Sequence, residues 1–402
     1  PDKNPRAMAA ASEGLVRTIK EKGIEATCAM EGLGLRSFAH SSGKGRPMTV
    51  FDIAKVAHLL FWFESPIWAD AGRYAPFFGK PLFNTRALVH AVDNAATARE
   101  MREKLGMANT VHTPWAVDAE VFAPRAAAEP EYDVVVSCGK GNPNPTPLAL
   151  KELDSDTPDM QAIRQDLIKH IAPFVKDFAS KSPKPAEVEG FLTRLLASQL
   201  ESRHTPLLER METIAGEDYK HAVGLQTIAA APAAFIQAGR IARNVEISER
   251  AFLISWLSRR FKTLIVGEHN LAPWGARAEN APAVRHPETP AALARGRVVV
   301  HTTRWQDDAG LGTRPFEIAA CGLAGLVQRR PGVESLFDEG KEMEFFDGPA
   351  QAAEKVRALL ADPSRRAAIG AAARARVERE HTWKHRAERL APAMLAAKQR
   401  LA

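Results

Sequence analysis

The stretch Gly310-Leu-Gly-Thr-Arg-Pro-Phe-Glu-Ile-Ala-Ala-Cys-Gly322 is the most informative part of this chain. It begins with a Gly-rich turn, and a short helix is predicted to follow. Arg314 and Glu317 stand three residues apart near the start of that helix, so their side chains can share one face. An apolar strand is predicted next, from Leu323 to Val327. A turn, a helix and a strand in this order indicate a parallel α/β sheet.

The same stretch suits the diphosphate of a nucleotide. A helix N-terminus presents unpaired N–H groups and the positive end of the helix dipole. We expect Gly310, Gly312, Thr313 and Arg314 to hold the diphosphate, because the guanidinium adds a planar charged clamp. We expect Glu317 to accept two hydrogen bonds from the ribose, as an acidic residue does in dinucleotide folds. The simpler alternative is an ion pair between Arg314 and Glu317, which contributes only about 0.3–0.5 kcal/mol when exposed.

Length and composition predict an ordinary globular protein of two domains. The chain has 402 residues, with 45% hydrophobic and 25% charged residues. The chain contains no run of about 18 apolar residues, so no transmembrane helix is predicted. The opening segment, Pro1 to Asn4, is not followed by the apolar core of a signal peptide. Cys28, Cys138 and Cys321 show neither a disulfide framework nor a metal-ligand spacing, so a cytoplasmic protein is expected.

The net charge is +6, and part of the excess lies between Arg365 and Arg389. Interspersed glutamates favour a solvated helix face there. The alternative is attraction to phosphates or to an anionic membrane, which predicts peripheral contact at the inner membrane surface. The chain shows no aromatic-interleaved basic motif, so we expect no nucleic acid partner.

Short apolar segments alternate with helical ones in both halves of the chain, which predicts a parallel sheet in each half. The predicted strands are residues 24–28, 57–64, 88–92, 110–112, 134–136, 263–266, 298–301, 323–327 and a short one near 345. A helical region, about 160–260, interrupts the second half. Its predicted apolar stripes are Ile163, Leu167, Ile171 and Phe174, and Phe252, Leu253, Trp256 and Leu257. We interpret about 155–255 as an insertion, which also offers a surface for a homodimer.

Several of these segments resemble the GT-B glycosyltransferases, specifically the "glycosyl transferases group 1" or CgeB-like (spore-maturation-protein-like) branch. The similar segments near the C-terminus are Gly312 to Gly322, Arg330-Pro-Gly-Val-Glu334, Phe345-Phe-Asp347 and His381-Thr-Trp-Lys-His-Arg386. Those near the N-terminus are Phe61-Trp-Phe-Glu-Ser-Pro66, Val89-His-Ala-Val-Asp93 and Thr113 to Pro124. Together with their surroundings they cover about half of the chain.

The resemblance implies two Rossmann-like domains that face a cleft. The expected bounds are 1–125 for the acceptor domain, 132–385 for the nucleotide-sugar domain, and 386–402 for a C-terminal helix. The first strand and Gly-rich loop of the acceptor domain are not evident before residue 6. A nucleotide sugar, with UDP as the expected nucleotide, is a substrate rather than a cofactor. No cofactor or metal is expected, because Asp307 and Asp308 are adjacent rather than spaced as Asp-x-Asp.

One departure from the resemblance concerns a pair of acidic residues. Retaining relatives carry two glutamates separated by seven residues. Glu317 matches the second glutamate, whereas the first falls on Ala309. The usual contact to the donor sugar is therefore in question.

Five further residues follow predicted strands or lie in the similar segments, and we expect them to contact the donor: Lys140, Gly267, His269, His301 and Glu334. For each, a plain alternative stays open. Lys140 can be a solvated turn lysine, and Gly267 and His269 can belong to an ordinary loop. His301 can be a satisfied core histidine, and Glu334 can cap a helix.

Catalysis needs stabilisation of the departing diphosphate and, in an inverting enzyme, a base for the acceptor hydroxyl. Glu64 is the best candidate base, because apolar neighbours such as Trp62 and Phe63 would raise its pKa. Asp93 and His58 are weaker candidates. A capping or ion-paired role for Glu64 is the alternative.

We therefore expect a glycosyltransferase of bacterial glycan biosynthesis that moves a sugar from a nucleoside-diphosphate sugar to a saccharide, lipid-linked or protein acceptor. Two alternatives stay open: a nucleotide-sugar epimerase of the same fold, and a non-catalytic protein that binds sugar nucleotides or serves in assembly. An epimerase would release an isomer of the donor, and a binding protein would release nothing.

Overall fold

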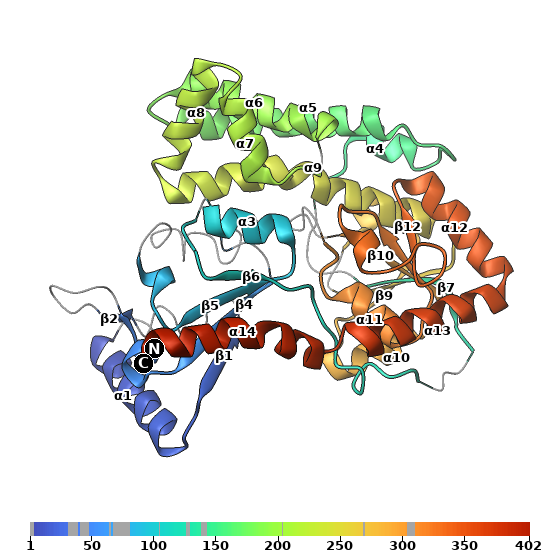
Figure 1. Cartoon of the computed structure of the whole chain (residues 1–402). Coiled ribbons are helices and arrows are strands. Elements are labelled where there is room, and N and C mark those ends of the chain that lie inside the picture. The colour runs from blue at the N-terminus through green and yellow to red at the C-terminus, as the bar shows by residue number, and fades with distance from the viewer. Residues whose placement is uncertain are drawn as a thin grey trace. The chain divides into compact units, whose positions relative to one another are not determined.

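The computed structural model describes residues 4–30, 39–40, 48–63, 66, 81–103, 105–125, 129–137, 143–202, 204–267, 270–303 and 310–402. The chain divides into two compact units: Pro1–Pro114 together with Lys384–Ala402, and Trp115–Trp383. Each unit contains a parallel sheet accompanied by helices (Figure 1). The predicted α/β class is therefore confirmed.

The first unit is built on a four-stranded parallel sheet in the order β1-β4-β5-β6. Its elements are α1 Pro5–Glu21, β1 Ala26–Met30, β2 Ala39–His40, β3 Met48–Thr49, α2 Val50–Ala54, β4 Ala57–Trp62, η2 Pro81–Asn84, β5 Leu88–Val92, α3 Ala95–Glu103, β6 Thr110–His112 and most of α14, Trp383–Leu401. All of β5 is buried, as a continuous apolar run predicts for a central strand.

The last helix completes the core of this unit. Ala397 of α14 is fully buried and packs with Ala57 of β4 and Val89 of β5. Nζ of Lys398 lies 3.1 Å from a carboxylate oxygen of Glu25, which adds an exposed ion pair. Residues about 300 positions apart in the sequence therefore share one apolar layer.

The second unit contains a six-stranded sheet in the order β12-β11-β10-β7-β8-β9, with every neighbouring pair parallel. Its strands are β7 Tyr132–Ser137, β8 Thr263–Val266, β9 Glu279–Ala281, β10 Gly296–His301, β11 Gly325–Gln328 and β12 Glu344–Phe346. Its helices are α4 Pro147–Glu152, α5 Met160–Ser180, α6 Pro185–Glu201, α7 Leu207–Ala215, α8 Tyr219–Ala229, α9 Pro232–Ser258, η3 Ala272–Trp274, η4 His286–Glu288, α10 Thr289–Leu293, α11 Arg314–Ala320, η5 Val333–Ser335, α12 Pro349–Ala361 and α13 Pro363–Glu380.

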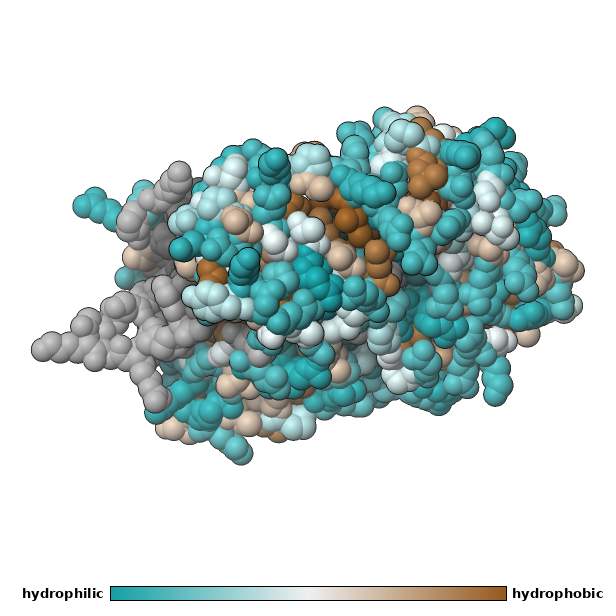
Figure 2. All heavy atoms as spheres, turned by 90° about the horizontal axis from the view of Figure 1, so that it is seen from above, coloured by the Kyte–Doolittle hydropathy of each residue, from teal (hydrophilic) through white to brown (hydrophobic). Residues whose placement is uncertain are grey.

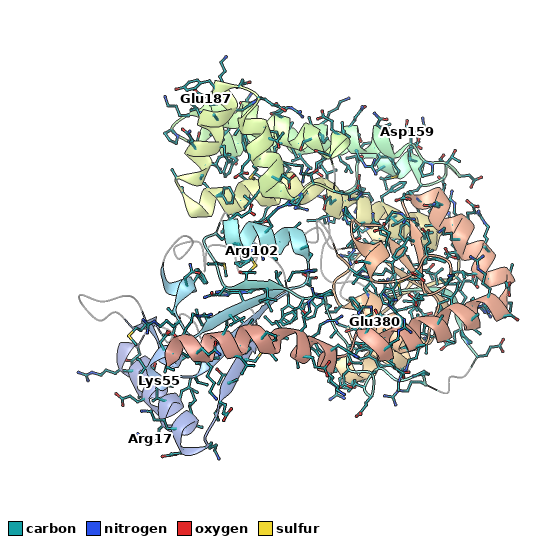
Figure 3. The ribbon with its side chains drawn as sticks, in the orientation of Figure 1. Arg17, Lys55, Arg102, Asp159, Glu187 and Glu380 are labelled. Carbon is teal, nitrogen blue, oxygen red and sulfur yellow. The ribbon has the colours of Figure 1, made fainter. Side chains whose placement is uncertain are left out.

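Helices α4 to α9 all lie between β7 and β8 in the sequence, and α5 to α9 pack together as a helical layer (Figure 1). We call α5 to α9 the helical insertion. Its charged side chains include Asp159, which caps α5, and Glu187 in the first turn of α6 (Figure 3). Viewed from above, this layer presents mostly hydrophilic side chains with apolar ones gathered between them (Figure 2).

One predicted apolar stripe of the insertion is wrong at its end. Ile163, Leu167 and Ile171 are buried, but the next buried position of α5 is Val175. Phe174 is 59% exposed. The buried positions repeat every four residues, so Val175 continues the row and Phe174 falls beside it. The second stripe, from Phe252 to Leu257, is buried as predicted.

Within the described part of the chain, no single helix is both long and apolar enough to cross a membrane. Taken together, α8 and residues 234–258 of α9 are long and apolar enough by length and composition alone, although the two helices are bent by 117° at their junction.

Candidate functional site

The strand order of the second unit marks a place for a ligand. The chain leaves β7, reaches β8 and β9 on one side of it, and returns to β10 on the other side. The connections after β7 and β10 therefore run in opposite directions from the carboxyl ends of adjacent strands. In open α/β sheets, ligands bind in the crevice at such a switch point.

Two segments that the sequence analysis singled out begin at this switch point. The first comprises residues 138–142 after β7 and includes Lys140, and the second comprises residues 304–309 after β10. Both segments lie outside the described residues. His301 is the last residue of β10 and is 7% exposed. Thr303 follows, and its hydroxyl donates to the Gln328 carbonyl over 3.5 Å. His301 is therefore at the expected edge of the sheet, but its side chain is buried.

A Gly-rich turn connects this edge to α11. Gly310 and Gly312 have φ values of 84° and 63°, in the left-handed region that favours glycine. The N–H of Gly310 donates to the carbonyl of Pro331 over 3.3 Å. The turn is therefore fastened to the loop that follows β11.

The start of α11 differs from the expected phosphate seat. The helix has only seven residues, and Pro315 has no N–H to offer. The N–H groups of Phe316 and Glu317 both donate to the Thr313 carbonyl, over 3.1 and 3.2 Å. Positive charge at this position therefore comes from the Arg314 side chain more than from the helix end.

Glu317 and Arg314 form the ion pair that the sequence analysis kept as an alternative. Oε2 of Glu317 lies 2.5 Å from Nη1 of Arg314. The Glu317 side chain is 6% exposed and that of Arg314 is 25% exposed. The pair is thus partly buried, and one of its members reaches solvent.

A third group, His286, joins this pair. Its Nε2 lies 3.4 Å from Oε1 of Glu317, and its ring meets Phe122 edge-on at 4.7 Å between centroids. The His286 side chain is 67% exposed, whereas that of Glu317 is only 6% exposed. Sequence reasoning missed His286, because the short η4 turn that carries it is distant from Glu317 in the sequence and has no motif.

The environment of the pair also changes the chemistry of a cysteine. Burial, followed by the negative charge of Glu317, raises the pKa of the Cys321 thiol to about 12. Cys321 directly follows α11 and is buried. It stays protonated at neutral pH and is not a nucleophile in this site.

Two other predicted donor residues are in different settings. Gly267 directly follows β8, and its N–H donates to the Ala281 carbonyl over 3.0 Å, which extends the pairing with β9. Its neighbour His269 lies outside the described residues. Glu334 has a side chain that is 63% exposed, with Oε1 3.7 Å from Nη1 of Arg329.

The candidate catalytic residues belong to the first unit. Asp93 directly follows β5 and is 5% exposed, at the carboxyl edge where a parallel sheet carries its ligands. Glu64 lies outside the described residues. Asp93 is therefore at the expected edge of the sheet, and the catalytic roles of Asp93 and Glu64 both remain predictions.

A histidine near Asp93 was not predicted. Burial lowers the pKa of His112, and the positive charge of Arg389 lowers it further, while a hydrogen bond with the backbone of Asp93 raises it. Arg102 and Arg386 add smaller effects in the same direction as Arg389. This edge of the first unit is therefore cationic.

Most arginines of the C-terminal basic tract are paired. Arg374, Arg376 and Arg379 each contact a glutamate of α13, and Arg365 pairs with Glu344. This pairing fits the interpretation of the tract as a solvated helix face.

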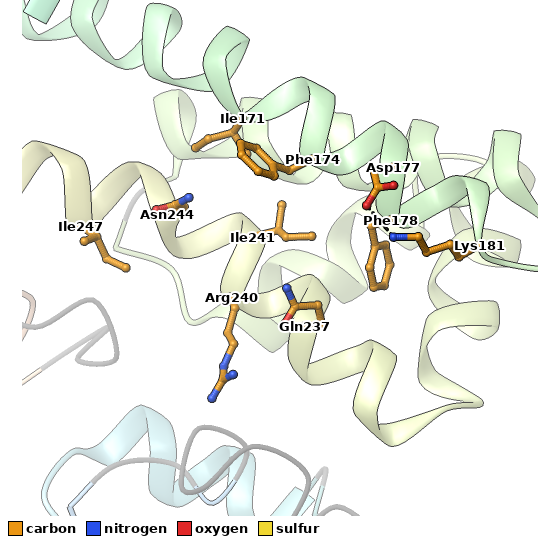
Figure 4. Close-up of a pocket in the computed structure, with 10 residues that line it drawn as sticks. All are labelled: Ile171, Phe174, Asp177, Phe178, Lys181, Gln237, Arg240, Ile241, Asn244 and Ile247. Carbon is orange, nitrogen blue, oxygen red and sulfur yellow. Dashed lines mark hydrogen bonds and ion pairs between the residues drawn. The ribbon is translucent and has the colours of Figure 1, made fainter. Parts of the chain in front are cut away.

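The helical insertion has a cavity of its own, of about 530 Å³, between α5 and α9 (Figure 4). Its lining residues are Ile171, Phe174, Asp177, Phe178, Lys181, Gln237, Arg240, Ile241, Asn244 and Ile247. None of these is a residue of the switch-point edge.

Sequence comparison identifies the class of part of the chain. Residues 243–391 match the family model described as "Glycosyl transferase-like", and this range contains β10, the Gly-rich turn and α11. The match confirms the predicted glycosyltransferase class for this segment. A search of curated proteins gives no significant match.

Comparison with solved structures gives distant similarities. Sucrose-phosphate synthase from Thermosynechococcus elongatus is similar with a TM-score of 0.48 and 12% identity, over 99% of this chain and 80% of that one. HepE from Anabaena, in complex with UDP, gives 0.43 and 10%, over 96% and 82%. A glycosyltransferase from Rickettsia africae gives 0.44 and 7%, over 99% and 83%.

Proposed function

We propose that the protein transfers a sugar from a nucleoside-diphosphate sugar to a hydroxyl of a saccharide, lipid-linked or protein acceptor. The observation that carries this proposal is the glycosyl transferase-like match over residues 243–391, which contain β10, the Gly-rich turn and α11. The family resemblance and the Gly-rich turn support a GT-B enzyme of the CgeB-like branch with a hexosyl donor.

In this proposal Arg314 neutralises the departing diphosphate. Its guanidinium is permanently charged and 25% exposed, so its other N–H groups can reach phosphate oxygens while Nη1 keeps its contact with Glu317. Charge supplied to the leaving group in this way lowers the barrier to sugar transfer.

Glu317 holds the ribose by exchanging one partner for another. The ribose hydroxyls replace the exposed His286 at Oε1, and Oε2 keeps its contact with Arg314. A buried carboxylate that loses one hydrogen-bond partner without gaining another destabilises the complex. We therefore expect Glu317 to favour ligands that offer two hydrogen-bond donors.

A calorimetric titration with UDP, GDP, ADP and dTDP tests the proposal. We expect one of these to bind to the wild type. Arg314→Met and Glu317→Gln should each weaken binding by about tenfold or more, as loss of a charged hydrogen bond of 1.5–3 kcal/mol implies.

Arg194→Met is the matched control. Arg194 has a side chain that is 30% exposed and pairs with Glu217 at 2.8 Å on the helical insertion, so its burial and pairing are like those of Arg314. Its loss should leave nucleotide binding unchanged. Absence of binding by all four nucleotides in the wild type would refute the proposed function.

We further propose that no metal takes part, because Arg314 can neutralise the diphosphate and no Asp-x-Asp pair follows a predicted strand: the pair Asp154-Ser-Asp156 comes after helix α4. Transfer measured with radiolabelled nucleotide sugars should keep its rate in EDTA. A loss of activity that Mg²⁺ or Mn²⁺ restores would contradict this. Peripheral membrane contact, a homodimer and Glu64 as base also remain predictions.

A further inference from the structure

The loop after β11 carries an arginine that is buried against the helical insertion. The side chain of Arg330 is 2% exposed. Its Nη1 lies 3.1 Å from Nδ1 of His204, which stands between α6 and α7, and its Nη2 lies 3.9 Å from Oε2 of Glu246 on α9. A guanidinium taken this far from water requires such partners. The loop after β11 therefore contacts the helical insertion through the charged side chain of Arg330.

Glu246 is itself held in place within the insertion. Its side chain is 3% exposed, and its Oε2 lies 3.4 Å from Nη1 of Arg243, one turn earlier on α9. The same carboxylate oxygen thus faces Arg243 and Arg330. A carboxylate between two buried guanidinium groups has little freedom to move.

The residue after Arg330 contacts the proposed donor site. The Pro331 carbonyl accepts the hydrogen bond from the N–H of Gly310, in the turn that leads to Arg314. A continuous path of contacts therefore runs from Glu246 through Arg330 and Pro331 to the Gly-rich turn.

We propose that Glu246 is a positioning residue for the donor site, acting through Arg330 on the Gly-rich turn. This inference rests on the proposed glycosyl transfer, and it assigns a function to the helical insertion that the motifs do not provide. In this proposal Glu246 acts through Arg330 and does not itself contact the donor. It fixes the backbone of residues 310–312 where Arg314 can meet the diphosphate, and small misplacements of such groups are costly.

Glu246→Gln tests this role, since it keeps the side-chain shape and removes the charge that holds Arg330. We expect the KM for the nucleotide sugar, and the dissociation constant of the nucleoside diphosphate that the wild type binds best, to rise about tenfold. Arg330→Lys keeps the charge but loses the planar fork, and should give a smaller increase of about threefold.

Glu249→Gln is the matched control. Glu249 lies one turn further along α9, is 5% exposed in its side chain, and pairs with Arg164 of α5 inside the insertion. Its loss should lower the melting temperature as Glu246→Gln does, yet leave the KM for the nucleotide sugar unchanged. A purely structural role would move both variants alike.

Hydrogen exchange supplies a second measurement that does not need turnover. The amide of Gly310 should lose protection in Glu246→Gln and keep it in Glu249→Gln, with UDP absent. Unchanged KM and unchanged Gly310 protection in a folded Glu246→Gln protein would overturn the inference, as would equal shifts in both variants. A wild type that binds no nucleoside diphosphate would instead refute the proposed function.

Discussion

At the residue scale, the first unit contains the buried histidines His90 and His58, whose hydrogen bonds favour the neutral ring. Nδ1 of His90 accepts from the Trp62 indole N–H over 3.1 Å, and its Nε2 lies 2.8 Å from the Phe83 carbonyl. These partners require the neutral ring with its proton on Nε2, because a protonated ring could not accept from Trp62. Nδ1 of His58 lies 2.8 Å from the Thr27 hydroxyl, and its ring stacks on Phe51 at 3.6 Å.

Acid should therefore destabilise the first unit. Burial lowers the pKa of His90 to about 4, and burial together with His90 lowers the pKa of His58 to about 3. Between pH 6.5 and about 4 the unfolded chain binds protons that the native state does not, so the free energy of unfolding falls as the pH falls. Each histidine contributes about 1.4 kcal/mol per pH unit below 6.5. Urea unfolding at pH 7.5, 6.0 and 5.0 measures this slope.

His90→Gln should reduce that slope, since it removes one of the three histidines whose pKa is lowered in the described part of this unit, while the amide can still accept from Trp62. His170→Gln, on the exposed side of α5, is the control and should keep the full slope. A wild-type stability that is constant from pH 7.5 to 5.0 would contradict the prediction.

At the scale of elements, the position of α11 depends on one close approach. Helix α13 passes the turn after α11, where an added Cβ at Gly370 would stand 2.1 Å from the Gly322 carbonyl oxygen. Arg374, one turn further along α13, donates to the Ala320 carbonyl at the end of α11 and to the Phe122 carbonyl. The helix that carries Arg314 and Glu317 is therefore seated by α13.

Gly370→Ala should destabilise the second unit by about 1–3 kcal/mol, because the methyl group forces α13 away from α11. The reference is Gly190→Ala in α6, where a Cβ meets nothing within 4 Å. That substitution should stabilise by about 0.5–1 kcal/mol through helix propensity. Thermal unfolding of both variants measures these changes in stability. An unchanged stability of Gly370→Ala would show that α13 and α11 are not so tightly packed.

At the scale of the whole molecule, the first unit depends on the end of the chain. Ala397 of α14 has no exposed surface and packs between Ala57 and Val89. The sequence analysis set residues 386–402 apart as a separate helix, and in the structure residues 384–402 belong to the first unit.

Ala397→Glu should destabilise the first unit by about 3 kcal/mol or more, since it places a charge against the apolar face of the sheet. Ala396→Glu changes the neighbouring exposed position and should shift stability by no more than about 0.5 kcal/mol. Protease sensitivity of residues 26–112 provides the measurement. Equal stability of the two variants would mean that α14 is not part of this core.

The sequence by itself determined most strands of the two parallel sheets, although β9 at the edge of the second sheet was not predicted. Strands 88–92, 110–112 and 263–266 have the predicted bounds. The mainly apolar runs 88–92 and 263–266 are buried along their whole length, as expected in a parallel sheet, whereas 110–112 is only partly buried. Errors of one to three residues occur where the run continues into a loop: β4 ends at Trp62 rather than at residue 64, and β11 begins at Gly325. Periodicity cannot specify where pairing stops.

Tertiary structure alone decided the partners of the site residues. The motifs marked Arg314, Glu317 and the segment that begins at Arg330. Nothing in the sequence marked His286 or Glu246, or the contact of Arg330 with Glu246, because these arise from contacts between distant segments. Local patterns reflect propensity and burial, which are properties of neighbouring residues. Which buried charge meets which partner depends on how whole elements pack, and that is settled only when the chain has folded.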